Sequence, residues 1–89
     1  MPAAAKKPAP PVRPDIRSVL AVNLIALRAS REWSQDALAL EAGLHRTFIA
    51  HVERQVRNIS LDNLDKLAKA FGVPTYELLV PARPPSLRR

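Results

Sequence analysis

The sequence contains no cysteine, two glycines and two histidines among its 89 residues. Without cysteine the chain has no disulfide, no thiolate chemistry and no zinc site with sulfur ligands. His45 and His51 are six residues apart, about 240° around a helix, so they cannot chelate one ion from the same face. No Ser–His–Asp set, pair of carboxylates or glycine-rich phosphate loop stands out. We therefore expect neither an enzyme nor a protein with a metal or cofactor.

A long hydrophobic segment is also missing. The longest uncharged apolar run, from Ser18 to Leu27, contains Asn23 and is far shorter than a membrane-spanning helix. Prolines follow Lys6 and Lys7 where a signal peptide needs apolar residues. The chain length allows one domain, and a hydrophobic content of 47% is too high for a disordered chain. These features predict a single-domain cytoplasmic protein.

The net charge of +6 is unevenly distributed along the chain. Residues 1–14 and 81–89 each carry three basic residues and no acidic one, whereas residues 15–80 carry eight of each. Eight of the nine prolines also lie in these two end segments. We expect residues 1–14 and 81–89 to be disordered basic tails and residues 15–80 to form the folded domain. The alternative is that the tails are basic arms that contact phosphates without reading sequence.

Residues 15–80 show no alternating strand pattern and predict an all-α fold, a compact bundle of five helices. Serine N-cap candidates at Ser34 and Ser60, and C-terminal glycines at Gly43 and Gly72, mark the ends of two of them. The expected helices are Asp15–Arg31, Gln35–Ala42, Arg46–Arg54, Leu61–Phe71 and Pro74–Leu79. The buried face of the first is expected at Ile16, Leu20, Leu24 and Leu27, and that of the fourth at Leu61, Leu64, Leu67, Ala68 and Phe71.

The connection at Gly43 carries the first functional signal. Two short helices, Gln35–Ala42 and Arg46–Arg54, are joined by about three residues that begin with this glycine. That spacing is typical of a helix-turn-helix, in which the second helix enters the major groove of DNA. An ordinary antiparallel hairpin within a helical bundle is the alternative.

The helix from residue 46 to 54 supports the first of these interpretations. Its apolar residues fall on one side of a helical wheel, at Phe48, Ile49 and Val52. The opposite side carries no acidic residue and is formed by Arg46, Thr47, Ala50, His51 and Arg54. Arginine can donate two hydrogen bonds to guanine, and a small residue lets the helix axis approach the bases. A solvated helix face is the alternative.

Six short sequence motifs follow one another in a fixed order through the expected helices. They are Leu27-Arg28, Ser34-Gln35-Asp36-Ala37-Leu38-Ala39, Gly43-Leu44-His45-Arg46-Thr47-Phe48-Ile49, Val52-Glu53-Arg54, Arg57-Asn58 and Phe71-Gly72-Val73. This pattern resembles the Cro-type (XRE) helix-turn-helix regulators over residues 20 to 80. It is most similar to single-domain members such as restriction–modification controller proteins and small phage repressors. The resemblance implies a cytoplasmic, nucleoid-associated transcriptional regulator.

The resemblance also implies roles for individual residues. The residues that match base-contacting positions are His45, Arg46, Thr47, Ala50 and His51. The residues that match positions near the DNA backbone are Ser34, Gln35, Arg54, Arg57 and Asn58. Arg28 and Glu53 match an internal ion pair, and Trp33 matches a core position. The partner would be an inverted-repeat operator in double-stranded DNA, bound by a homodimer with half-sites about 34 Å apart.

Three residues depart from the family pattern. Gln55 replaces the glycine that the family has just after the recognition helix, here residues 46–54. It must therefore either adopt a left-handed backbone or change the turn. Ile59 replaces a proline, and His45 replaces a better N-cap residue.

Apolar residues outside the expected core predict a protein contact. We expect a homodimer interface at Leu78, Leu79 and Val80, although these residues could instead complete the core of the monomer. A second apolar stripe on the first helix is formed by Val19, Val22 and Ile25. A further protein partner could bind one of these patches, as in an antitoxin that also binds DNA.

Overall fold

The computed structural model describes residues 15–81, so the expected tails at 1–14 and 81–89 lie outside this range except for residue 81. The described part is helical and contains no strand. Its elements, in chain order, are α2 (Ile16–Arg31), α3 (Gln35–Ala42), α4 (Arg46–Glu53), α5 (Leu61–Phe71) and the 3₁₀ helix η1 (Thr75–Leu79). The all-α fold is therefore confirmed.

The prediction of five α-helices is wrong within the described residues, which contain four α-helices and a 3₁₀ segment. In η1 the backbone N–H of Glu77 donates to the carbonyl of Pro74, three residues earlier, at 3.0 Å. Five residues are too few to build the i to i+4 bonds of a stable α-helix, so the segment closes the tighter turn. Thr75 Oγ1 also donates to Asp65 Oδ1 (3.1 Å) on α5. This hydrogen bond, together with one from Lys69, lowers the pKa of the Asp65 carboxyl.

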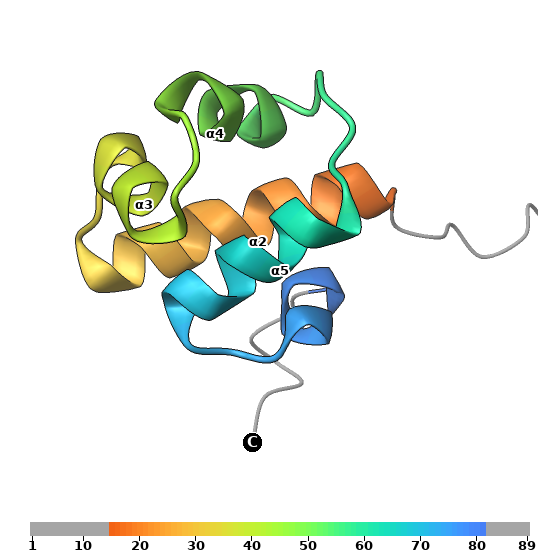
Figure 1. The fold of residues 1–89 in the computed structure, drawn as a ribbon. Helices are drawn as coiled ribbons and strands as arrows, with labels where there is room; N and C mark the ends of the chain where they lie inside the picture. Colours follow the sequence, from red (N-terminus) through yellow and green to blue (C-terminus); the bar gives the residue numbers. More distant parts are fainter. Residues whose placement is uncertain (1–14, 82–89) are drawn as a thin grey trace, which may run out of the picture.

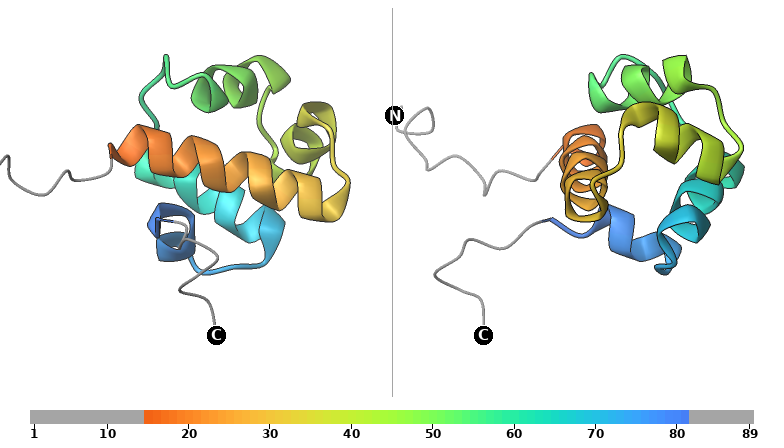
Figure 2. Two further views of the ribbon diagram at one scale, coloured as in Figure 1. Left: turned by 180° about the vertical axis from the view of Figure 1, so that it is seen from behind. Right: turned by 90° about the vertical axis from the view of Figure 1, so that its left-hand side faces the viewer.

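The helices are arranged around α2, which packs against α4 on one side and η1 on the other (Figure 1). α3 contacts both α4 and α5, and α5 contacts η1. In all three views α4 lies at one edge of the fold, with η1 toward the opposite edge (Figure 2). One side of α4 thus has no neighbouring element of the described chain against it.

The core takes one fully buried side chain from each element, namely Leu24, Leu38, Ile49, Leu67 and Leu78. Burying each such side chain contributes about 1.5–3 kcal/mol. Because every element supplies one, the position of α4 depends on all the others.

Four residues predicted to mark helix boundaries do so in the structure, two serines at helix starts and two glycines at helix ends. Ser34 Oγ accepts from the N–H of Ala37, and Ser60 Oγ accepts from the N–H of Asn63, both at 3.0 Å. Gly43 and Gly72 adopt left-handed backbone at φ 70° and 71°. An added Cβ would be strained in that conformation, so glycine sets where α3 and α5 end.

Two residues of the predicted buried faces are exposed instead. Ile16 is 51% exposed and Leu61 is 81% exposed. Each is the first residue of its helix, and at that end the helix extends past the core it packs on. Trp33, expected in the core, is half-buried and stacks on Phe71 with ring centroids 5.5 Å apart.

Candidate nucleic-acid interface

The segment between α3 and α4 has the geometry of a helix-turn-helix. α3 ends at the left-handed Gly43, whose following residue Leu44 donates its N–H to the carbonyl of Ala39 at 2.9 Å. α4 then begins at Arg46, after His45, whose side chain makes no capping hydrogen bond. The turn therefore carries α4 across α3 with its outer side facing away from the bundle (Figure 1).

The buried side of α4 lies where the helical wheel places it. Ile49 and Val52 are buried and Phe48 is half-buried against the core. On the opposite side Arg46 and Thr47 are exposed, and Ala50 and His51 are half-buried. Arg54 is exposed and lies one residue beyond the end of the helix, at its C-cap. The predicted recognition face is accordingly open to solvent in the single chain.

An internal ion pair anchors α4 to the other helices. Arg28 Nε lies 2.6 Å from Glu53 Oε2, and Arg28 Nη2 donates to Glu53 Oε1 at 2.8 Å. Arg28 Nη1 donates to the carbonyl of Trp33 (3.0 Å), and Gln35 Nε2 donates to Glu53 Oε1 (2.9 Å). The hydrogen bond to Glu53 raises the pKa of Arg28, desolvation lowers it, and charge attraction to Glu53 raises it further. The network therefore joins α2, α3 and α4.

This network keeps the negative charge of Glu53 away from the predicted recognition face, the outer side of α4 formed by Arg46, Thr47, Ala50 and His51. The Glu53 side chain is 5% exposed, so its carboxylate faces Arg28 and Gln35 rather than solvent. The Gln35 amide, expected to bind a phosphate, is engaged here instead within the single chain. Ser34 remains exposed at the start of α3.

A second acidic residue does lie at the surface near α4. Asp36 Oδ1 is 3.6 Å from Arg46 Nε, and both side chains are mostly exposed. Since exposed pairs of this kind contribute about 0–1 kcal/mol, this one orients Arg46 more than it stabilises the fold.

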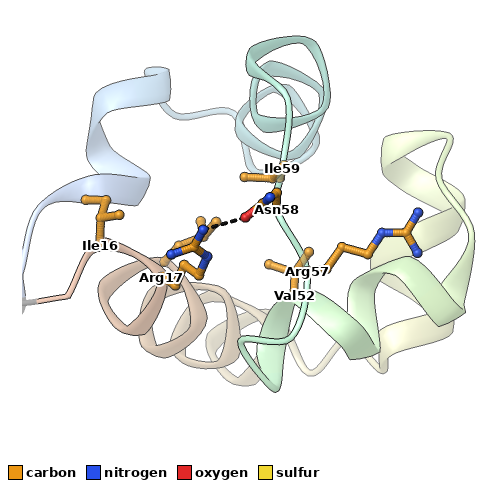
Figure 3. Close-up of a pocket in the computed structure, with 7 residues that line it drawn as sticks. Ile16, Arg17, Val52, Arg57, Asn58 and Ile59 are labelled. Atoms are coloured by element: carbon orange, nitrogen blue, oxygen red, sulfur yellow. Dashed lines mark hydrogen bonds between the residues drawn. The ribbon is translucent and has the colours of Figure 1, made fainter.

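The connection after α4 adopts one of the two conformations expected for it. Gln55 has φ 63°, a left-handed backbone that glycine accepts without strain. The chain then places the Arg57 guanidinium over the Phe48 ring, 5.5 Å from its centroid. Asn58 lies on the other side of the connection, where its Oδ1 accepts a hydrogen bond from Arg17 Nη2 (Figure 3).

We expect Gln55→Gly to stabilise the protein by about 0.5–1 kcal/mol, because it removes left-handed strain at the cost of a more flexible unfolded chain. Urea unfolding of the two proteins measures the difference. Gln55→Ala is the control, since it removes the same side chain but keeps the strained Cβ. A glycine variant no more stable than the alanine variant would show that this turn stores no strain.

Arg17 is the residue that the sequence reasoning missed. It lies 41 residues before Asn58, in the first turn of α2, and no motif or spacing connects the two. Only the folded arrangement, with the start of α2 beneath the connection from α4 to α5, brings them together (Figure 3).

The expected dimer residues differ in exposure. Leu78 is fully buried within one chain, so the expectation that it forms an interface is corrected and it belongs to the monomer core. Leu79 is half-buried, whereas Val80 is 48% exposed. Asn23 Nδ2 donates to the carbonyls of Leu78 (2.8 Å) and Val80 (3.0 Å), which holds this end of the chain on α2.

No helix in residues 15–81 combines the length and apolar character needed to cross a membrane. The same range holds no group of three or more His, Cys, Asp or Glu side chains suited to a metal ion.

The helix-turn-helix family HTH_3 matches residues 24–78. Control protein C.BamHI of Bacillus amyloliquefaciens is 44% identical over 66 residues, 73% of this chain and 82% of that protein. The crystal structure of hypothetical transcription factor NHTF from Neisseria is 47% identical with a TM-score of 0.75, over 83% of this chain and 86% of that chain. The restriction-modification controller C.Esp1396I, a tetramer in complex with its natural 35 base-pair operator, is 26% identical with a TM-score of 0.66, over 75% and 92% of the chains. The chain belongs to the helix-turn-helix family and is an XRE-type DNA-binding regulator, not an enzyme.

Proposed function

We propose that the protein is a transcriptional regulator of the controller type that binds an inverted-repeat operator as a homodimer and inserts α4 of each subunit into the major groove. The observation that carries the proposal is the open, acid-free outer side of α4, beside which Glu53 is held by Arg28. The family supports DNA as the partner. A relative crystallised as a tetramer on its operator supports assembly on DNA.

In this proposal one group of residues contacts the bases and a second group contacts the DNA backbone. Base readout belongs to His45, Arg46, Thr47, Ala50 and His51, with Arg46 and Thr47 most exposed on the first turn of α4. Backbone contacts belong to Ser34, Gln35, Arg54, Arg57 and Asn58. For Gln35 to reach a phosphate, its amide has to leave Glu53 or share its donors with it.

Selection from a random duplex library at about physiological salt tests the proposal. A sequence reader enriches one motif, and a two-fold symmetric dimer enriches two inverted half-sites whose centres lie about 34 Å apart. Enrichment of no motif would contradict sequence-specific recognition. A single half-site would contradict the dimer but not the reading by α4.

We place the dimer surface at exposed apolar residues of α2 and the end of η1, namely Val22, Ile25 and Val80. Val22 and Ile25 are one turn apart on α2, and the bond from Asn23 to the carbonyl of Val80 holds Val80 against the same helix. Single exposed apolar residues are ordinary, but a contiguous group on a small domain indicates a contact surface.

We expect Val80→Glu to yield a monomer with weak operator affinity, because a charge buried between two subunits is costly to desolvate. Sedimentation measures the oligomeric state. Leu40→Glu is the matched control, since Leu40 is exposed on α3, away from this surface. If Val80→Glu stays a dimer and Leu40→Glu becomes a monomer, the interface lies on α3 instead. A stable complex with an unrelated protein, lost only in Val80→Glu, would assign the surface to a partner such as a toxin.

A further inference from the structure

A depression of about 230 Å³ lies between the start of α2, the end of α4 and the connection that leads to α5 (Figure 3). Its apolar part is formed by Ile16, Leu20, Val52 and Ile59. Its polar part is formed by Arg17, Arg57 and Asn58. The lining residues thus combine a hydrophobic floor with the Arg17 guanidinium and the Asn58 amide, and include no acidic side chain.

Arg17 is exposed and makes one hydrogen bond within residues 15–81, from Nη2 to Asn58 Oδ1. No carboxylate in the same range forms an ion pair with it. A guanidinium carries five N–H donors. Several of them therefore stay available to a ligand while the bond to Asn58 fixes where the group lies.

The same bond orients Asn58. Because its Oδ1 accepts from Arg17, its Nδ2 forms the other arm of the same planar amide and can donate in a different direction. The positive charge and the amide donors therefore lie side by side at the rim of the depression. Arg57 is directed away from Arg17, toward α4 (Figure 3).

This pattern suits one repeat of the DNA backbone, which is anionic at the phosphate and largely apolar on the face of the deoxyribose. Arginine and asparagine donors are typical phosphate contacts, and an apolar floor can receive the sugar. The depression is also continuous with the end of α4, since Val52 and Arg57 line it.

We propose that Arg17 and Asn58 bind a backbone phosphate of the operator, with its sugar over Ile16 and Ile59, so that α2 contributes to the DNA interface. This inference rests on the proposed function, because it adds one contact to the complex formed by α4. It places on the DNA an arginine that lies outside the helix-turn-helix.

The test is the salt dependence of DNA binding by the full-length protein, measured on the selected operator and on random duplex DNA. Each phosphate neutralised contributes about 0.9 to the slope of log K against log salt. We expect Arg17→Ala to lower the slope by about that amount on both DNAs and to leave the ratio of the two affinities unchanged. Lys66→Ala, which removes an equal charge from an exposed position of α5, is the matched control and should keep the wild-type slope.

Arg17→Gln separates direct binding from positioning of Asn58. The glutamine amide can still donate to Asn58 Oδ1 but carries no charge, so the slope should fall as it does in Arg17→Ala. A wild-type slope in Arg17→Gln would overturn the phosphate contact and leave Arg17 a positioning residue. A wild-type slope in Arg17→Ala, or a fall equal to that in Lys66→Ala, would also overturn it. Wild-type protein that prefers no sequence contradicts the proposed function itself, which the Arg17 variants do not affect.

Discussion

Arg28→Ala is expected to destabilise the protein by about 3 kcal/mol, the lower end of the cost of removing one partner from a buried ion pair, because this pair is only partly buried. The Glu53 carboxylate would remain in a site that is 5% exposed, and within residues 15–81 the Gln35 amide would be its one remaining side-chain donor. A domain of this size loses about 4–8 °C of melting temperature per kcal/mol. Thermal unfolding followed by circular dichroism measures the effect as a difference in melting temperature between the variant and the wild type.

The pH range of this contribution follows from the direction of the Arg28 shift. Its pKa is raised in the folded chain, chiefly by the hydrogen bond to Glu53. A raised pKa contributes stability that is complete below the unfolded value and is lost as pH rises through the folded one. For arginine that loss begins only under strongly alkaline conditions, so Arg28 remains charged in any neutral buffer.

Two variants distinguish a buried pair from a surface pair. Replacing both partners by apolar residues, as in Arg28→Met with Glu53→Leu, should destabilise less than Arg28→Ala because no buried charge is left alone. Lys69→Ala breaks the exposed pair with Asp65 (3.3 Å) and should change the stability little, because solvent screens exposed ion pairs. If Arg28→Ala costs no more than Lys69→Ala, the network does not hold α4 in place.

The helices and their ends were predictable because local signals decide them. The hydroxyl oxygens of Ser34 and Ser60 accept hydrogen bonds from backbone N–H groups in the first turn of the helices that follow them. Gly43 and Gly72 end helices because they adopt left-handed backbone. The last segment was misjudged because a proline before a few apolar residues suits a 3₁₀ turn as well as an α-helix. Leu61 was misplaced because periodicity gives the face of a residue but not how far along the helix the core extends.

The site was predictable only where its residues share one helix. The outer side of α4 follows from spacing alone, since 3.6 residues per turn separate it from Ile49 and Val52. Contacts between elements are different, because residues far apart in sequence meet only in the folded chain. The resemblance to a family supplied the Arg28–Glu53 pair, whereas nothing in the sequence connected Arg17 with Asn58.

Arg46→Ala is expected to cost about 1–3 kcal/mol at the selected operator and to flatten discrimination at one base pair of each half-site. Arg46 is exposed on the first turn of α4, and Asp36 lies against its Nε. That arrangement leaves the two terminal nitrogens free for the O6 and N7 of guanine. Competition binding with operators altered at single base pairs measures both the affinity and the discrimination.

Asp36→Asn tests whether the acid directs Arg46 toward a base. Without its charge, Arg46 can turn to a phosphate, and repulsion between Asp36 and the DNA backbone disappears. Binding to random DNA should therefore tighten while discrimination at the same base pair falls, a combination that loss of a stabilising contact would not produce. If Arg46→Ala weakens binding to operator and random DNA equally, Arg46 contacts a phosphate and not a base. The contacts to base edges would then be assigned to Thr47 and its neighbours on α4.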